Sequence, residues 1–255
     1  MAQIRELTTN KLKVKIYENR SEMGRGAAND VCERIQVLLT RQQFVNIIFA
    51  AAPSQNEFLS SLSEKERVDW SRINAFHMDE YIGLDEKAPQ RFGQFLKENI
   101  FDKVPFHKVY YLDGNAMDTE AECRRYAGLL KQHPVDIVCM GIGENTHVAF
   151  NDPHDADFND PLMVKAVTLD EVSRQQQVND GCFATIDEVP VAAVTLTVPA
   201  LLQAKRIYCI VPGSKKAQAV YHTLNSDVKE DFPSTALREH NQVILYLDKE
   251  SAARL

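Results

Sequence analysis

The sequence has few cysteines, few glycines and prolines, and no long apolar run. Ten Gly and ten Pro among 255 residues are too few for a collagen-like or low-complexity chain. The five cysteines are odd in number, widely spaced and never arranged as C-x-x-C, which argues against a disulfide framework and a structural zinc site. We therefore expect reduced thiols that lie mostly in the core.

The sequence also lacks a targeting segment and an excess of positive charge. No apolar stretch follows Met1, and the longest apolar runs have the length of strands, so we predict a cytoplasmic protein without a membrane span. The formal net charge is −7, from 29 Lys and Arg against 36 Asp and Glu, which disfavours a nucleic-acid partner. A small anionic substrate remains compatible, because one or two local cations suffice to bind a phosphate.

What the sequence does contain is an alternation of short apolar runs with helical patterns. With 44% hydrophobic residues, the chain can bury a large core, and without linkers or repeats we assign one domain, 1–255. The runs are rich in Val and Ile without clean alternation, as in strands buried on both faces. We predict strands at 45–51, 73–76, 135–140, 192–198, 206–211 and 243–247, and helices at 21–40, 54–63, 90–100, 119–132 and 214–224.

This order predicts an α/β fold of the doubly wound type, a largely parallel sheet with helices on both faces in a Rossmann-like three-layer sandwich. Ligands bind in such folds beyond the carboxyl ends of the strands, where the sheet order reverses. The residues that follow each strand are therefore the candidates for a functional site.

Two strand ends suggest an anion site. Ser54 followed by Glu57 has the pattern of a capping box, so a helix starting there would aim backbone N–H groups at the strand tip. Taken alone, the pattern favours an ordinary capped surface helix, because capping boxes are common. After 206–211, Gly213 turns the chain and Ser214 caps a helix with Lys215 or Lys216 in its first turn. A lysine there opposes the helix dipole unless it faces an anion.

Two other strand ends suggest proton transfer. Asp79 and Glu80 follow a strand directly, and one of them could be desolvated into a base, although adjacent acids usually face solvent. The segment 141–153, Gly-Ile-Gly-Glu-Asn-Thr-His-Val-Ala-Phe-Asn-Asp-Pro, brings His147 within five residues of Asp152, a plausible proton-transfer pair. A metal site here, with His154 and Asp155, matches no zinc or calcium spacing.

Together these segments resemble the glucosamine-6-phosphate deaminase (isomerase) family, whose superfamily includes 6-phosphogluconolactonases. The resemblance spans about 45–247 and rests on Met78-Asp-Glu-Tyr-Ile-Gly-Leu, on segment 141–153, on Val189-Pro before a Thr-rich strand, and on Gly213-Ser-Lys-Lys-Ala. The pairing of Asp-Glu-Tyr with His-x-Ala-Phe-Asn is specific to the deaminase branch. The resemblance implies conversion of a 2-amino-2-deoxyhexose 6-phosphate to a ketohexose 6-phosphate and ammonia, without metal or organic cofactor.

The resemblance also implies roles for individual residues. Asp79 would move a proton from C2 to C1, and His147 would assist ring opening, with Asn145 and Asp152 at the positions of its two acidic partners. The implied phosphate ligands are Ala52, Ser54, Gln55 and Lys216, with Arg174 as a further candidate. Since oligomers are common among similar enzymes, the resemblance implies a homo-oligomer. It also implies that the protein binds a small amino sugar phosphate.

The chain departs from the family pattern in places. The usual phosphate loop, Thr-Gly-(Ser/Thr/Gly)-Thr-Pro, is here Ala51-Ala-Pro-Ser-Gln; the usual Asp-Gly-His is Asn145-Thr-His; and the usual Glu is Asp152. An amide orients an imidazole without stabilising its cation by charge, so His147 should accept a proton less readily. These changes suggest a divergent branch that acts on another amino sugar phosphate, such as galactosamine 6-phosphate, so the expected substrate is glucosamine or galactosamine 6-phosphate. The alternatives are a sugar-phosphate lactonase and a non-catalytic sugar-phosphate sensor.

Overall fold

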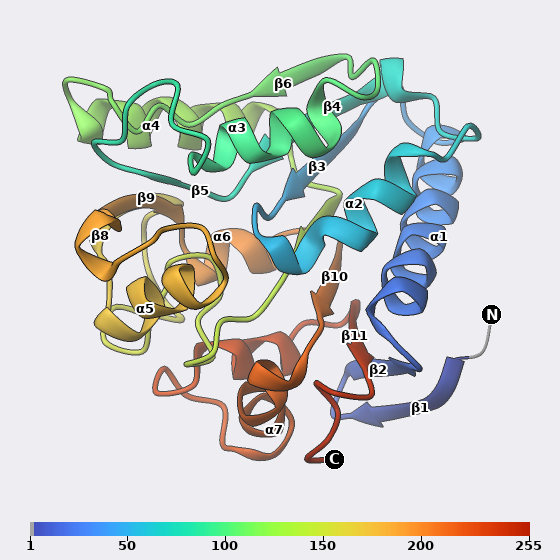
Figure 1. Cartoon of the computed structure of the whole chain (residues 1–255). Helices are drawn as coiled ribbons and strands as arrows, with labels where there is room; N and C mark the ends of the chain where they lie inside the picture. Colours follow the sequence, from blue (N-terminus) through green and yellow to red (C-terminus); the bar gives the residue numbers. More distant parts are fainter. Residues whose placement is uncertain (1–2) are drawn as a thin grey trace.

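The computed structural model describes residues 3–255 and centres on an eight-stranded sheet of order β1-β2-β11-β10-β7-β3-β4-β6 (Figure 1). β1 pairs with β2 in the antiparallel sense, and every other pairing in this sheet is parallel. Its strands are β1 (Gln3–Thr9), β2 (Leu12–Tyr17), β3 (Val45–Phe49), β4 (Ile73–His77), β6 (Lys108–Tyr110), β7 (Ile137–Met140), β10 (Arg206–Val211) and β11 (Val243–Asp248). The predicted doubly wound α/β fold is confirmed.

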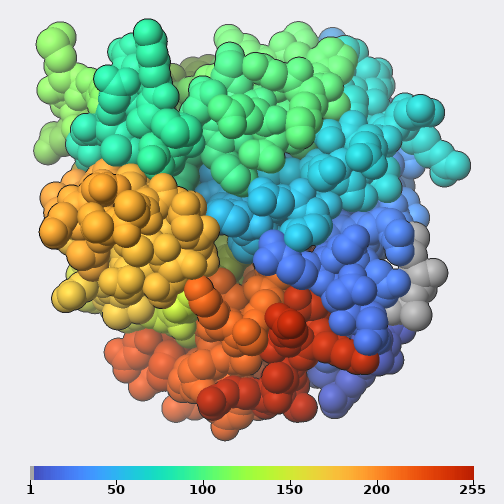
Figure 2. Space-filling view, viewed as in Figure 1, coloured from blue at the N-terminus to red at the C-terminus, as the bar shows by residue number. Residues whose placement is uncertain are grey.

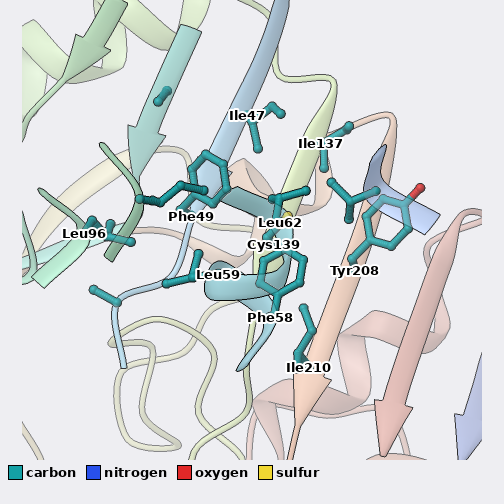
Figure 3. Packing of buried hydrophobic residues seen from close by; sticks show 14 of the residues in the cluster. Ile47, Phe49, Phe58, Leu59, Leu62, Leu96, Ile137, Cys139, Tyr208 and Ile210 are labelled. Carbon is teal, nitrogen blue, oxygen red and sulfur yellow. The ribbon is translucent and has the colours of Figure 1, made fainter. Parts of the chain in front are cut away.

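Apolar side chains on both faces of the sheet explain why helices cover both. Along β3, Ile47 and Phe49 join one buried cluster, while Ile48 between them joins the other. The first cluster packs against α1 (Arg20–Leu39), α2 (Asn56–Ser63) and α3 (Phe92–Leu96), and the second against α4 (Thr119–Gln132), α6 (Val198–Leu202) and α7 (Ala217–Asn225). Figure 3 shows part of the first cluster, where Phe58 and Leu62 of α2 lie over the strands.

Side chains at the helix starts fix two of the long helices. The Asn19 side chain accepts a hydrogen bond of 2.9 Å from the backbone N of Glu22 at the start of α1, and Asp118 does the same for Ala121 in α4. Such caps satisfy N–H groups that have no partner inside the helix. The start of α4 coincides with the prediction, and that of α1 lies one residue before it.

A second sheet corrects one strand assignment. We expected 192–198 in the main sheet, but β9 (Ala192–Leu196) lies between β5 (Asp79–Tyr81) and β8 (Val164–Thr168) in an antiparallel three-stranded sheet of order β5-β9-β8. Its apolar run is buried, and burial alone does not reveal which strand is the partner. The remaining long helix, α5 (Glu171–Asn179), was missed because its sequence is almost entirely polar.

Six short helical turns complete the described structure: η1 (Pro53–Gln55), η2 (Trp70–Arg72), η3 (Lys97–Phe101), η4 (Ile186–Glu188), η5 (Ser214–Lys216) and η6 (Pro233–Arg238). All five cysteines are free thiols, and four of them are buried, as expected. Within residues 3–255, no helix has both the length and the apolar character needed to cross a membrane.

Candidate active site

A pocket opens beyond the carboxyl ends of the central strands. The chain order in the sheet reverses between β3 and β7, which is where a ligand crevice is expected in a doubly wound fold. On the face shown in Figure 2, the yellow and orange segment that carries β8 and α5 forms a lobe at one side. The residues that line the pocket come from the segments after β3, β4, β7 and β10, from the start of β5, and from α3 and α5. They include Ser54, Gln55, Asp79, Gly143, His147, Gln176, Gln177 and Lys216.

Asp79 is the buried carboxylate of this pocket. It lies in β5, opposite Thr195 of β9, and is 7% exposed. Among the described residues, none donates a hydrogen bond to its carboxylate, and burial together with the nearby Glu80 raises the pKa of Asp79 well above its usual value. A carboxylate that faces a pocket with a raised pKa is suited to accept a proton from carbon.

The neighbouring carboxylate, Glu80, has a structural task instead. It is 1% exposed and accepts hydrogen bonds from the backbone N of Tyr81 at 2.9 Å and of Phe92 and Gly93 at 3.0 Å. The last two belong to the first turn of α3, so Glu80 neutralises a helix start. The structure thus separates two adjacent acids that the strand-end pattern alone did not distinguish.

His77 holds the backbone of Asp79 in place. The fully buried ring accepts a hydrogen bond at Nε2 from the backbone N of Leu112, at 2.9 Å, and its Nδ1 lies 2.8 Å from the carbonyl oxygen of Asp79. Because one nitrogen accepts, the other carries the proton and donates it to that carbonyl. Burial lowers the pKa of His77, so the ring stays neutral in this arrangement.

His147 is presented to the pocket by a tight turn after β7. The backbone N of Gly143 donates to the carbonyl oxygen of His147 at 2.9 Å, and a Cβ on Gly143 would lie 2.2–2.3 Å from the imidazole ring. Thr146 has a φ of +73°, a left-handed conformation that favours glycine. The turn therefore needs a glycine at 143 and strains the threonine at 146.

Behind the ring, polar groups converge on Asp152. Its Oδ1 lies 3.1 Å from His147 Nδ1 and accepts from Asn145 Nδ2 at 3.0 Å, and its Oδ2 accepts from the backbone N of Asp170 at 3.2 Å. Burial by itself would raise the pKa of Asp152, but the hydrogen bonds from His147, Ser173 and Asn145 prevail and lower it. Asp152 is therefore an ionised partner of the histidine.

The structure refines the expectation for Asn145. Its Oδ1 accepts from the backbone N of His147 at 3.1 Å, while its amide nitrogen donates to Asp152. The amide therefore does not contact the ring itself, and it supplies Asp152 with a proton that an ionised carboxylate at this position would lack.

The cation of the pocket is Lys216, which is 7% exposed. Gly213, with a φ of +89°, turns the chain before it, and the carboxylate of Asp248 holds the backbone N of Gly213 at 3.0–3.1 Å. Burial lowers the pKa of Lys216 against the opposing effect of Asp180 and Glu144. Lys215, by contrast, is exposed and bonds the carbonyl oxygen of Asn179 at 3.1 Å.

Of the loop residues expected to bind phosphate, Ala52, Ser54 and Gln55 all line the pocket. The prediction of a capping box was wrong: η1 leads directly into α2, neither has a side-chain cap, and Glu57 bonds Arg20 at 2.7–2.9 Å instead. Likewise Ser214 does not cap its helix. Gln55 is 1% exposed, its amide nitrogen donates to the carbonyl oxygen of Ile210 at 3.1 Å, and its Oε1 has no partner among residues 3–255.

Arg174 is not brought to the pocket. Its guanidinium donates to the carbonyl oxygens of Ile186 and Val189 at 2.7–3.2 Å, so it ties α5 to the following turn η4. The same helix contributes residues that sequence reasoning missed, namely Ser173, which contacts His147, and Gln176 and Gln177, which line the pocket. Their polar run carries no motif that would have indicated a site.

Comparison with known proteins places these residues in a family. The family model described as glucosamine-6-phosphate isomerases/6-phosphogluconolactonase matches residues 18–245. A glucosamine-6-phosphate deaminase of Bacillus cereus (strain G9842) is 36% identical over 187 residues, which is 73% of this chain and 70% of the relative. One from Bacillus thuringiensis (strain Al Hakam) is 37% identical over the same lengths.

Solved structures agree. A monomeric glucosamine-6-phosphate deaminase superposes with a TM-score of 0.86 at 29% identity, covering 95% of this chain and 99% of that one. A 6-phosphogluconolactonase from Thermotoga maritima gives 0.76 at 19% identity over 94% and 100%, a similarity of fold alone. The chain therefore belongs to the glucosamine-6-phosphate isomerase/6-phosphogluconolactonase family of enzymes.

Proposed function

We propose that this protein is an amino-sugar-phosphate deaminase/isomerase, which converts glucosamine or galactosamine 6-phosphate and water to a ketohexose 6-phosphate and ammonia. The observation that carries the proposal is the buried Asp79 carboxylate, which shares one pocket with His147 and Lys216. Moving a proton between adjacent carbons requires one base beside both, and a carboxylate with a raised pKa meets that need.

The reaction begins with ring opening. A proton leaves the C1 hydroxyl and another reaches the ring oxygen, and His147 carries this transfer through Nε2, which has no hydrogen-bond partner among residues 3–255. Asp152, ionised and 3.1 Å from Nδ1, stabilises the imidazolium that forms.

Asp79 then carries the isomerisation. It accepts the C2 proton, and the electron pair left on C2 forms a double bond to C1 while the π pair of the C1 carbonyl moves to its oxygen, which takes a proton released by the C2 ammonium. The nitrogen lone pair then forms a double bond to C2, and the electrons of the C1–C2 double bond take the proton back from the Asp79 carboxyl at C1. The C2 carbon becomes an iminium, which adds water and releases ammonia. The electron pairs shift within the substrate and each step needs only an acid, a base or water, so Asp79 and His147 suffice and we propose no cofactor.

Lys216 and the loop 50–55 are the proposed phosphate site. A buried ammonium makes strong charge-assisted hydrogen bonds to phosphate oxygens, and Ser54, which lines the same pocket, adds a hydroxyl donor. Asp180 and Glu144 act on Lys216 only from a distance, so the substrate phosphate would be its direct counter-ion.

An assay of ammonia release with glucosamine 6-phosphate and galactosamine 6-phosphate, side by side, tests the proposal. We expect ammonia and ketohexose phosphate in equal amounts, and a loss of about 10²- to 10⁴-fold in kcat for Asp79→Asn. The exposed Asp187→Asn is the matched control and should retain activity. No ammonia from a folded preparation would refute the assignment.

The same preparation separates the two alternatives. A lactonase would hydrolyse 6-phosphogluconolactone without ammonia, and it would not require a carbon base at Asp79. A sensor would be stabilised thermally by sugar phosphate without turnover, and Asp79→Asn would still bind. The curated relatives at 36–37% identity support the deaminase, whereas the lactonase relation is one of fold.

A further inference from the structure

Ser173 lies between the two members of the proposed proton-transfer pair. It sits in the first turn of α5 and is 1% exposed. Its Oγ lies 2.7 Å from His147 Nδ1 and bonds Asp152 Oδ1, with Asn145 Nδ2 at 3.4 Å. The hydroxyl therefore contacts the back of the imidazole, the side away from its unpartnered Nε2.

The position of the protons follows from counting donors. A serine hydroxyl has one proton, and an ionised carboxylate only accepts. Asp152 is held ionised, so the Ser173 proton lies toward Asp152. The Ser173 oxygen must then accept from His147, which places the imidazole proton on Nδ1 and leaves the lone pair on Nε2.

Distances show why the serine matters beside the aspartate. His147 Nδ1 is 3.1 Å from Asp152 Oδ1 but 2.7 Å from Ser173 Oγ, and charge-assisted N–H···O bonds are typically about 2.7–2.9 Å. The serine oxygen is therefore the nearer acceptor for the Nδ1 proton, and Asp152 at 3.1 Å is the more distant one. The hydroxyl closes the gap, and its own bond to Asp152 transmits the negative charge.

We infer that Ser173 is a positioning residue for His147: its hydroxyl, bonded to Asp152, accepts the Nδ1 proton and so keeps Nε2 as the proton acceptor in the pocket. The inference rests on the proposed function for its catalytic consequence. Its structural content, the tautomer of the ring, stands apart from turnover.

The test uses the full-length protein with Ser173→Ala, Ser173→Cys, Ser173→Thr and the double variant Ser173→Ala/Asp152→Glu. For Ser173→Ala we expect kcat for ammonia release to fall about 10- to 100-fold with KM nearly unchanged, because the residue acts through His147. Ser173→Thr should recover most of the lost kcat. Asp152→Glu adds one methylene, so the double variant should also recover part of it. Ser63→Ala, at the end of α2 and 110 residues before Ser173 in the sequence, is the control for loss of a serine hydroxyl and should keep the wild-type kcat.

A second readout does not depend on turnover. ¹⁵N NMR of the His147 ring should show the proton on Nδ1 in the wild type and a larger Nε2–H population in Ser173→Ala. Should Ser173→Ala not fold, Ser173→Cys keeps the volume with a weak donor and gives the same comparison. A wild-type kcat and an unchanged tautomer in Ser173→Ala and Ser173→Cys would overturn the inference. If the protein releases no ammonia at all, the proposed function fails while the NMR arm still decides the role of Ser173.

Discussion

Asp79→Asn should make the protein more stable while removing its activity. The wild-type carboxylate is 7% exposed and accepts no hydrogen bond from the described residues, and burial raises its pKa. Leaving a buried polar group without a partner costs about 1–3 kcal/mol. A charged group costs more than this and a neutral amide does not, so the free energy of unfolding of Asp79→Asn should exceed that of the wild type by about 1–3 kcal/mol at neutral pH. At about 2–4 °C per kcal/mol for a chain of this size, Tm should rise by roughly 2–12 °C.

The pH dependence of this gain follows from the direction of the shift. Below the unfolded-state pKa of about 3.9, the carboxyl is protonated in both states, and the charge costs the native state nothing. As pH rises, the unfolded state ionises first, because the folded-state pKa is higher. Native stability therefore falls until the folded-state pKa is reached, and the advantage of Asp79→Asn grows over the same range.

Urea unfolding of wild type, Asp79→Asn and the exposed control Asp187→Asn, each at about pH 4.5 and at neutral pH, measures this difference. The control should show little change at either pH. An Asp79→Asn protein that is less stable than the wild type at neutral pH, or whose gain is the same at both pH values, would refute the account of Asp79 as a buried, unpartnered charge.

Three further substitutions test the surrounding geometry. Thr146→Gly should raise the free energy of unfolding by about 1 kcal/mol, because it relieves a β-branched residue at a φ of +73°; urea midpoints that do not rise would contradict this strain. Gly143→Ala should displace the His147 ring, since the new Cβ would lie 2.2–2.3 Å from it, costing about 1–3 kcal/mol and most of kcat; near-normal kinetics would argue against the tight turn. Lys216→Gln should raise KM for the sugar phosphate about 10- to 100-fold, as for loss of a hydrogen bond to a charged group. Because burial lowers the pKa of Lys216, the wild-type protein should also lose affinity for the sugar phosphate at a lower pH than it would with an exposed lysine. A KM that does not change with pH would count against the role of Lys216.

The sequence alone was sufficient for the layers and for most of the pocket. Runs of Val and Ile buried on both faces specify a parallel sheet with helices on either side, and the switch-point rule then directs attention to strand ends. Asp79, His147, Ser54, Gln55 and Lys216 follow strands in the sequence and do line one pocket. Their roles in catalysis and the oligomeric state stay predictions.

Only the tertiary structure decided which polar groups face the pocket and which are already hydrogen-bonded elsewhere in the protein. Glu80 is occupied by the start of α3, which leaves Asp79 as the unpartnered acid. The Arg174 guanidinium hydrogen-bonds backbone carbonyl groups outside the pocket, whereas Ser173, from the same polar helix, contacts His147. The physical reason is that burial and hydrogen-bond partners are set by segments distant in the chain. Ser173 of α5, for example, contacts Nδ1 of His147, which lies 26 residues earlier. Local patterns of charge and hydropathy do not indicate such contacts between distant segments.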